Sequence, residues 1–176
     1  MKAAKIIAFI SLFLIFTSLC LTACNQALTP PPASIGEAGA LEAAKRYTKA
    51  LALCKNKVVE MLEYDGYTSD EINYAIAYCG VDWNEEAIEA ANNALSIAAY
   101  SKEGIEKLLS LVGFTVEEAE YASKNCGANW KEQAAKSVTE HIDLFPSYSK
   151  EQIIELLELA GFTDEEIAYG INQAYK

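Results

Sequence analysis

Few residues in this 176-residue chain combine the types and spacing that catalysis or metal binding requires. His141 is the one histidine, and no serine, cysteine or carboxylate stands in a pattern around it that would make it a catalytic base. No Asp-x-Asp-x-Asp-Gly loop or similar calcium-binding pattern is present. We therefore expect no enzyme activity, no bound metal and no cofactor. His141 is expected to be a surface or half-buried polar residue.

Cysteine could form a covalent crosslink in the folded part of the chain. Cys54 precedes the second expected helix of the fold, and Cys79 ends the third. These ends are neighbours in an antiparallel helix pair, so a disulfide is geometrically possible, and export from the cytoplasm permits one. We predict a Cys54–Cys79 disulfide, with Cys126 free and buried as a small apolar residue.

Carboxylates are the chemical groups that dominate the chain. The sequence holds 25 Asp and Glu against 14 Lys and Arg, a net charge of -11, and residues 58–176 hold 23 acids against 7 Lys. Helix dipoles explain single acids at helix starts, but they do not explain so large an excess. Such a surface favours a cationic partner and repels nucleic acid. A glycosidase-like carboxylate pair stays open, since nothing in the sequence separates such a pair from solvated helix charge. The acids that we predict to bind a partner cluster near expected helix starts: Glu85, Glu86, Glu89, Glu117, Glu118, Asp164, Glu165 and Glu166.

The chemistry indicated most clearly is lipid attachment at Cys24. Lys2 and Lys5 give a basic start, residues 6–21 are almost continuously apolar, and Leu21-Thr22-Ala23-Cys24 follows. This is the order of a secretory signal, and its end resembles the lipobox of bacterial lipoproteins, in which the Cys is lipidated and begins the mature chain. The apolar run is shorter than the roughly 20 residues that span a bilayer.

These observations predict a signal peptide over residues 1–23, then the lipidated Cys24 and a proline-rich linker over residues 24–36. Acyl chains on Cys24 would anchor the protein in the lipid bilayer. The expected location is the extracellular face of the cell membrane, with the folded part held off the lipid by the extended linker.

The remainder of the sequence repeats about every 47 residues. Gly66-Tyr67-Thr68 returns as Gly113-Phe114-Thr115 and as Gly161-Phe162-Thr163, and Trp83 returns as Trp130. A period of this length indicates an array of supersecondary units. We predict three repeats, over residues 37–82, 83–129 and 130–176.

Each repeat is predicted to contain three helices and no strand. Apolar residues in the second helix follow the i, i+3, i+4 spacing of one buried helix face, as in Ile105, Leu108 and Leu109. The predicted fold class is therefore all-α, a tandem array of three small helix-turn-helix-like repeats. The expected first helices span 37–52, 83–98 and 130–144, the second 55–64, 102–112 and 150–160, and the third 69–79, 116–126 and 164–175.

Capping residues mark the expected helix ends. Thr68, Thr115 and Thr163 each precede a Glu at the third helical position, the pattern of a capping box. The same pattern appears in the pairs Ser149–Gln152, Asp82–Glu85 and Asn129–Glu132. The glycine before each Tyr-Thr or Phe-Thr corner suits a left-handed helix end, and its aromatic neighbour is expected to pack between two helices.

Recurrent aromatic residues allow two interpretations. Trp83 and Trp130 are expected as packing wedges between consecutive repeats, with an exposed anchor for a partner as the alternative. Tyr74, Tyr121 and Tyr169 recur in the third helix. They are expected to be half-buried with the hydroxyl in water, although a contact surface for a partner is also possible.

The combination of these motifs resembles the Ltp-type host cell surface-exposed lipoproteins. The resemblance covers residues 37–176 together with the lipobox. It is carried by Ala87-Ile88-Glu89-Ala90-Ala91, Gly113-Phe114-Thr115, Glu118-Ala119-Glu120-Tyr121-Ala122 and Val81-Asp82-Trp83-Asn84-Glu85-Glu86-Ala87. The chain departs from the family in having three units, in carrying Cys54 in place of Ser and in lacking the Asp-Trp ending after its third unit.

Members of that family are built of small helix-turn-helix-like domains. Some, encoded by temperate phages, act in superinfection exclusion, and the resemblance implies binding to an injected tail component such as the tape measure protein. We expect a membrane-anchored binding module that captures a basic segment of a phage tail protein and blocks DNA entry. The alternative is a chromosomal surface lipoprotein that binds cell-wall or host-surface material.

Overall fold

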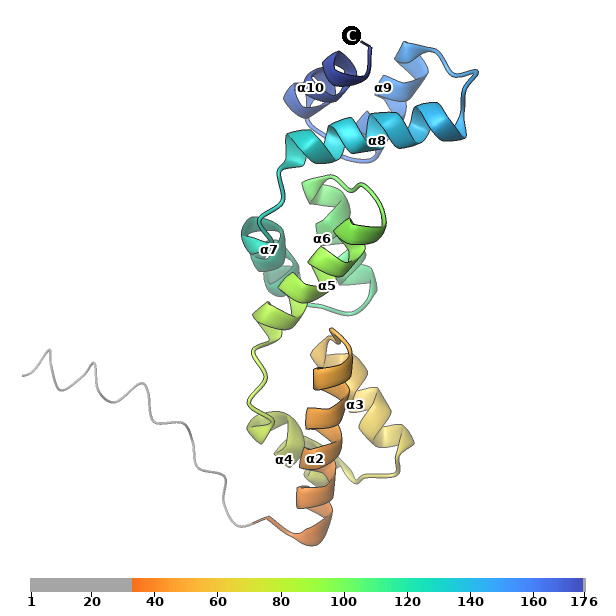
Figure 1. Cartoon of the computed structure of the whole chain (residues 1–176). Helices are drawn as coiled ribbons and strands as arrows, with labels where there is room; N and C mark the ends of the chain where they lie inside the picture. Colours follow the sequence, from red (N-terminus) through yellow and green to blue (C-terminus); the bar gives the residue numbers. More distant parts are fainter. Residues whose placement is uncertain (1–32, 176) are drawn as a thin grey trace, which may run out of the picture. The chain divides into compact units, whose positions relative to one another are not determined.

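The computed structural model describes residues 33–175. Nine α-helices and no β-strand lie in this part of the chain, which confirms the predicted all-helical class (Figure 1). The predicted helix limits agree with the observed ones to within two residues. Cys24, the predicted signal peptide and the linker as far as residue 32 lie outside the described residues. The helices are α2 (Ile35–Ala50), α3 (Lys55–Tyr64), α4 (Ser69–Tyr78), α5 (Trp83–Ile97), α6 (Lys102–Leu111), α7 (Val116–Asn125), α8 (Trp130–Leu144), α9 (Lys150–Leu159) and α10 (Asp164–Ala174).

Capping boxes explain where most of the helices begin. In each box a Ser or Thr side chain accepts the N–H of the third helical residue, whose Glu or Gln side chain accepts the N–H of the cap. Four boxes confirm the sequence prediction, and the one at Ser34 is additional. The five caps are Ser34, Thr68, Thr115, Ser149 and Thr163.

The predicted boxes at Asp82 and Asn129 form only in part. Asp82 accepts the N–H of Asn84, and Asn129 accepts the N–H groups of Lys131 and Glu132. The carboxylate of Glu132 accepts a hydrogen bond from the Tyr169 hydroxyl on α10. It does not accept the N–H of Asn129, which a complete capping box would require. A tertiary contact has therefore taken the place of a local one.

Three consecutive helices pack around each of three apolar cores. The first helix of each set has 15 or 16 residues and packs chiefly on the third, while the second helix closes the core. We call these sets the first (α2–α4), second (α5–α7) and third (α8–α10) helix groups. At the centre of the three cores lie Leu62, Leu109 and Leu157, each at most 1% exposed.

Small residues on the first helix allow the third helix to approach closely. Ala43, Ala91 and Ala134 are buried on α2, α5 and α8. In the third group, a Cβ atom added to Gly170 on α10 would lie 2.9 Å from the backbone of Ala134. The alanine-rich pattern of the first helices thus serves helix–helix packing.

The Gly-aromatic-Thr corners take the predicted form. Gly66, Gly113 and Gly161 have φ angles of 89°, 105° and 82°, which a residue with a Cβ atom rarely adopts. Phe114 and Phe162 are buried in their cores, and Tyr67 packs half-buried against the first core.

Two tryptophans pack at the junctions between helix groups. Trp83 begins α5 but packs against the core of the first group, and Trp130 begins α8 but packs against the core of the second. Both are half-buried. This confirms their interpretation as wedges between consecutive groups.

The predicted Cys54–Cys79 disulfide is not formed. Cys54, Cys79 and Cys126 are all free thiols. The Cys54 side chain turns into the second core and its Sγ lies 3.3 Å from the carbonyl oxygen of Val112, whereas Cys79 packs against the first core with its Sγ 3.4 Å from the carbonyl oxygen of Ile76. The prediction considered only the helix pair within one group, but the start of α3 faces the next group. Cys126 is half-buried rather than buried.

Candidate functional site

An apolar groove with an acidic rim lies between α6 and α7 in the second helix group. Its volume is about 490 Å³. Ala119 is buried at its floor, while the side chains of Leu111 and Val116 are 83% and 62% exposed. The other lining residues are polar or charged: Glu103, Glu106, Lys107, Ser110 and Glu120.

Helix periodicity explains why these residues share one groove. On α6, Glu103, Glu106, Lys107 and Ser110 are three or four positions apart and lie on one face of the helix. Ile105 and Leu109 point instead into the core. The same helix therefore supplies both the core and the acidic wall.

Hydrogen bonds hold the carboxylates of the rim in place. The buried Ser123 hydroxyl donates to Glu106 Oε1 at 2.5 Å, Lys107 Nζ lies 2.6 Å from Glu103 Oε1, and Lys124 Nζ donates to Glu120 Oε2 at 2.9 Å. The hydrogen bond from Lys124, together with its charge, lowers the pKa of Glu120. Glu120 is therefore ionised at neutral pH, and the three carboxylates of the rim exceed the single Lys107 that lines it.

The corresponding groove of the third helix group lies between α9 and α10. Its volume is about 370 Å³. Ile167 and Ile171 lie at its floor, 5% and 3% exposed, and Glu158 and Asp164 are its acids. Two helix groups therefore present an apolar groove with acidic margins at the same place in their folds.

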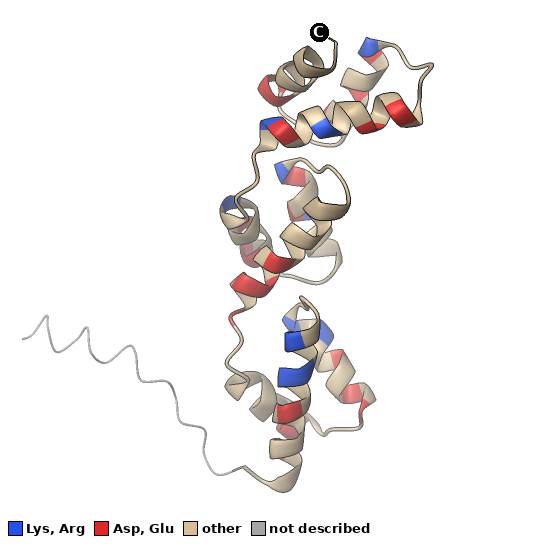
Figure 2. Cartoon of the chain, in the orientation of Figure 1, with Lys and Arg blue, Asp and Glu red and all other residues tan. Residues whose placement is uncertain are grey.

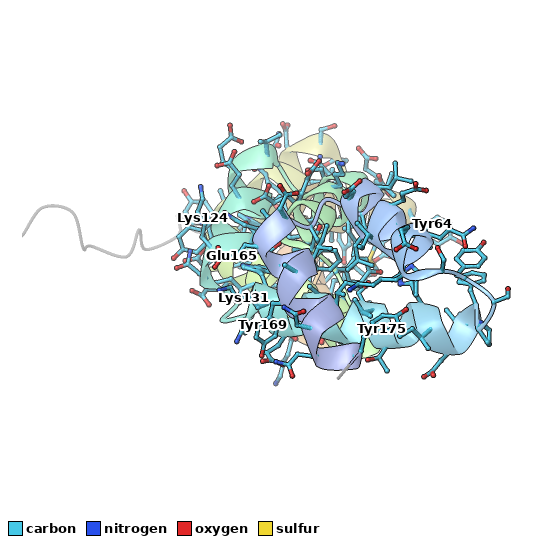
Figure 3. All side chains as sticks on the ribbon, turned by 90° about the horizontal axis from the view of Figure 1, so that it is seen from above. Tyr64, Lys124, Lys131, Glu165, Tyr169 and Tyr175 are labelled. Carbon is cyan, nitrogen blue, oxygen red and sulfur yellow. The ribbon has the colours of Figure 1, made fainter. Side chains whose placement is uncertain are left out.

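The acids predicted from the sequence do not gather at one place. Glu118 and Glu166 serve the capping boxes of α7 and α10, and Glu165 forms a 2.6 Å ion pair with Lys131 on α8 (Figure 3). Asp164 lines the groove between α9 and α10, and Glu165 and Glu166 line a separate groove of about 490 Å³ together with Trp130 and Lys131. Exposed positions away from the grooves are occupied by Glu85, Glu89 and Glu117.

Glu86 lies at the junction of the first and second groups. It is half-buried, and its Oε2 atom is buried with no hydrogen-bond partner among the described residues. Burial raises the pKa of this carboxyl group, and a hydrogen bond from the Leu53 N–H offsets part of that effect. Glu86 is therefore a junction residue, not a surface acid facing solvent.

Sequence reasoning missed Glu103, Glu106, Glu120 and Glu158, which line the grooves. Glu106, Glu120 and Glu158 lie within or at the end of their helices, so a search for acids near helix starts overlooks them, whereas Glu103 lies in the first turn of α6. The usable signal is their position on the helix face adjacent to the core face. Glu103 and Glu106 are three residues apart, and Ser110 and Leu111 continue the face.

Charge divides along the described chain (Figure 2). Lys45, Arg46 and Lys49 place basic side chains on α2, whereas Glu85, Glu86 and Glu89 place acids on α5. The basic side chains of α2 and the acidic side chains of α5 are therefore carried on separate helices.

The recurrent tyrosines differ in exposure. Tyr74 is 9% exposed, Tyr121 is 41% exposed, and Tyr169 is half-buried. The Tyr169 hydroxyl donates to Glu132, next to the Lys131–Glu165 pair (Figure 3). Only Tyr169 therefore matches the expected half-buried ring.

His141 occupies a half-buried position, in agreement with the expectation from the sequence. Its Nδ1 atom lies 2.7 Å from the carbonyl oxygen of Ser137, and its ring lies near that of Phe145. Within residues 33–175, no group of His, Cys, Asp and Glu side chains is arranged to hold a metal ion.

Comparison with known proteins gives one match. The family model for the host cell surface-exposed lipoproteins matches residues 37–78, which lie in the first helix group. The match confirms, over the first helix group, the resemblance that the sequence motifs indicated. No curated protein and no solved structure matches the chain. Among the described residues, none of the helices has the length and apolar character needed to cross a membrane.

Proposed function

Because residues 37–78 carry the domain of the host cell surface-exposed lipoproteins, we propose that this chain is a lipid-anchored binding module that acts in superinfection exclusion. Cys24 is the proposed lipid attachment site, and the extracellular face of the cell membrane is the proposed location. The three helix groups are proposed to be tandem copies of one module. The partner is a basic, amphipathic segment of an incoming phage tail protein, such as the tape measure protein. Its capture would block entry of the phage DNA.

The observation that carries this proposal is the groove between α6 and α7. An apolar floor flanked by carboxylates is complementary to an amphipathic helix whose apolar residues enter the groove and whose Lys or Arg residues meet the rim. Leu111 and Val116 already expose much of their apolar surface there. Covering that surface would supply affinity, and the rim charges would supply orientation and a fast encounter.

Charge also argues against other partners. Residues 58–176 carry a net charge of -16, so this part of the chain repels the phosphate backbone of DNA. The grooves are close to the size of small-molecule sites, but their open, acidic margins favour a cationic side-chain pattern over an apolar ligand.

A binding titration with a matched pair of variants tests the proposal. The probes are helical fragments of tape measure proteins from challenge phages, measured at low and physiological salt. The groove variant carries Glu103→Gln, Glu106→Gln and Glu120→Gln. The control variant carries Glu85→Gln, Glu89→Gln and Glu117→Gln, so it loses the same charge outside the groove.

We expect salt-dependent binding that the groove variant weakens about tenfold, because three rim pairs contribute roughly 0.2 to 1 kcal/mol each. The control variant should stay close to the unsubstituted protein, apart from a small long-range effect that salt screens. Absence of binding to every tail fragment would defeat the proposal. Equal weakening by both variants would show that the groove is not the binding site.

A further inference from the structure

The two junctions between helix groups are built from the same contact. At the first junction Cys54 Sγ donates to the carbonyl oxygen of Val112 at 3.3 Å, and at the second Ser101 Oγ donates to the carbonyl oxygen of Ala160 at 2.5 Å. In both, the donor is the N-cap residue of one group's second helix, and the acceptor is the C-cap residue of the next group's second helix. Both donor side chains are buried, with 3% and 0% exposure.

Glycine completes the acceptor side of each junction. A Cβ atom added to Gly113 would lie 2.9 Å from Cys54 Sγ, and one added to Gly161 would lie 2.8 Å from Glu103 Oε2. The next group therefore reaches the glycine corner at close range. We call the surface around the N-cap residue of a group's second helix its donor face, and the surface around the C-cap residue and the following glycine its acceptor face. A donor face and an acceptor face meet twice within the described chain.

The third donor face is exposed among the described residues. Ser149, the N-cap residue of α9, is exposed, and its hydroxyl contacts only its own helix start: it accepts the N–H of Gln152 and hydrogen bonds to the Glu151 carboxylate. Tyr148 beside it is 39% exposed and stacks on Phe145, whereas Tyr100 at the same place in the second group packs against the core. An interface that is buried twice in the chain is open here.

The first acceptor face is likewise exposed among residues 33–175. Asp65 is the C-cap residue of α3, and it is followed by the exposed Gly66. A Cβ atom added to Gly66 would meet no atom within 4 Å, in contrast to Gly113 and Gly161. The described residues therefore present one exposed donor face, at Ser149, and one exposed acceptor face of the same type, at Asp65 and Gly66.

We infer that copies of this chain associate head to tail, with the Ser149 face of one copy docked on the Asp65–Gly66 face of the next. The contact continues the junction that joins the groups within the chain, so a second copy is the occupant whose complementarity the structure already shows. Such a heterologous contact is open-ended and adds further copies in the same way. Gly36 stands where Trp83 and Trp130 reinforce the internal junctions, and the acidic copies repel one another, so the contact between copies is weaker than the contact within one.

Cysteine crosslinking in cells that express the full-length protein tests this inference. Because a Cβ atom at Gly113 would come within 2.9 Å of Cys54 Sγ, thiols at the equivalent positions Gly66 and Ser149 would be within disulfide reach between copies. The double variant Gly66→Cys with Ser149→Cys should give a ladder of oligomers under mild oxidation. Each single variant should give no ladder. The matched control pairs Gly66→Cys with Thr139→Cys, which places the second thiol at an exposed position on α8.

Because Gly66→Cys introduces backbone strain at a positive φ angle, a second measurement uses a chain that keeps Gly66. The unsubstituted mature chain with Cys24→Ser should show a sedimentation coefficient that rises between about 10 μM and 1 mM, the range of a weak protein contact. Ser149→Arg should abolish the rise. A ladder that is equal in the control pair would overturn the inference, and so would a concentration-independent monomer in sedimentation.

Discussion

Replacing Ser101 with alanine should destabilise the protein more than the same change at any exposed helix cap. The Ser101 hydroxyl has two partners: it accepts the N–H of Gly104 at 2.8 Å and donates to the carbonyl oxygen of Ala160 at 2.5 Å. Loss of an N-cap costs about 1 kcal/mol, and loss of a buried hydrogen bond that leaves a carbonyl unpaired costs about 1 to 2 kcal/mol more. We expect a loss of about 2 to 3 kcal/mol.

Ser149→Ala is the matched control. Ser149 caps α9 as Ser101 caps α6, but it is exposed and bonds to no other helix group. Its replacement should therefore cost about 1 kcal/mol. The difference between the two variants isolates the contact between the second and third groups.

Urea denaturation followed by far-ultraviolet circular dichroism measures both variants. Helix groups that contact only their neighbours can lose cooperativity when a junction weakens, so Ser101→Ala should also broaden the transition. Equal losses for Ser101→Ala and Ser149→Ala would refute the reasoning, because the junction bond would then contribute nothing.

Three further outcomes follow from the structure. Glu86→Gln should raise the free energy of unfolding at pH 7 by about 0.5 to 1 kcal/mol, since burial raises the pKa of Glu86 and its charged form is penalised in the folded state. Urea titrations should show this gain shrinking as the pH falls through the raised pKa toward the ordinary glutamate value of 4.5, and gone below that value; a gain independent of pH would contradict this. Leu157→Ala should cost about 2 to 5 kcal/mol, because Leu157 is fully buried in the third core, and a thermal melt that shifts by less than Ser149→Ala would contradict this. A thiol titration of the mature chain with Cys24→Ser should find three thiols without reductant, with Cys54 reacting last because it is 3% exposed; a count of one would restore the Cys54–Cys79 disulfide.

Local features were readable from the sequence because local interactions determine them. Capping boxes such as Thr115 with Glu118, the positive φ angle of Gly113 and the wedge role of Trp130 each depend on neighbouring residues or on the repeat spacing. Helix limits follow from the same signals. These features set the three-helix cores and therefore the grooves between the second and third helices.

Contacts between helix groups were not readable in the same way. The orientation of Cys54 toward Val112 depends on how one group packs on the next, so reasoning within one group paired it wrongly with Cys79. The same limit applies to the candidate site. Acids near helix starts are conspicuous in the sequence, but Glu118 and Glu166 are used in caps, while Glu106 and Glu120 of the groove lie within helices.

The central claim is that the anchored, acidic chain protects its host from phage entry by binding. It is tested most directly by the efficiency of plating of challenge phages on hosts that express the unsubstituted chain, the Cys24→Ser form or the groove variant. The account predicts reduced plating with the unsubstituted chain and restored plating with the other two, at equal protein levels. Full plating of every challenge phage on the host with the unsubstituted chain would contradict it, as would protection that survives both Cys24→Ser and the groove substitutions.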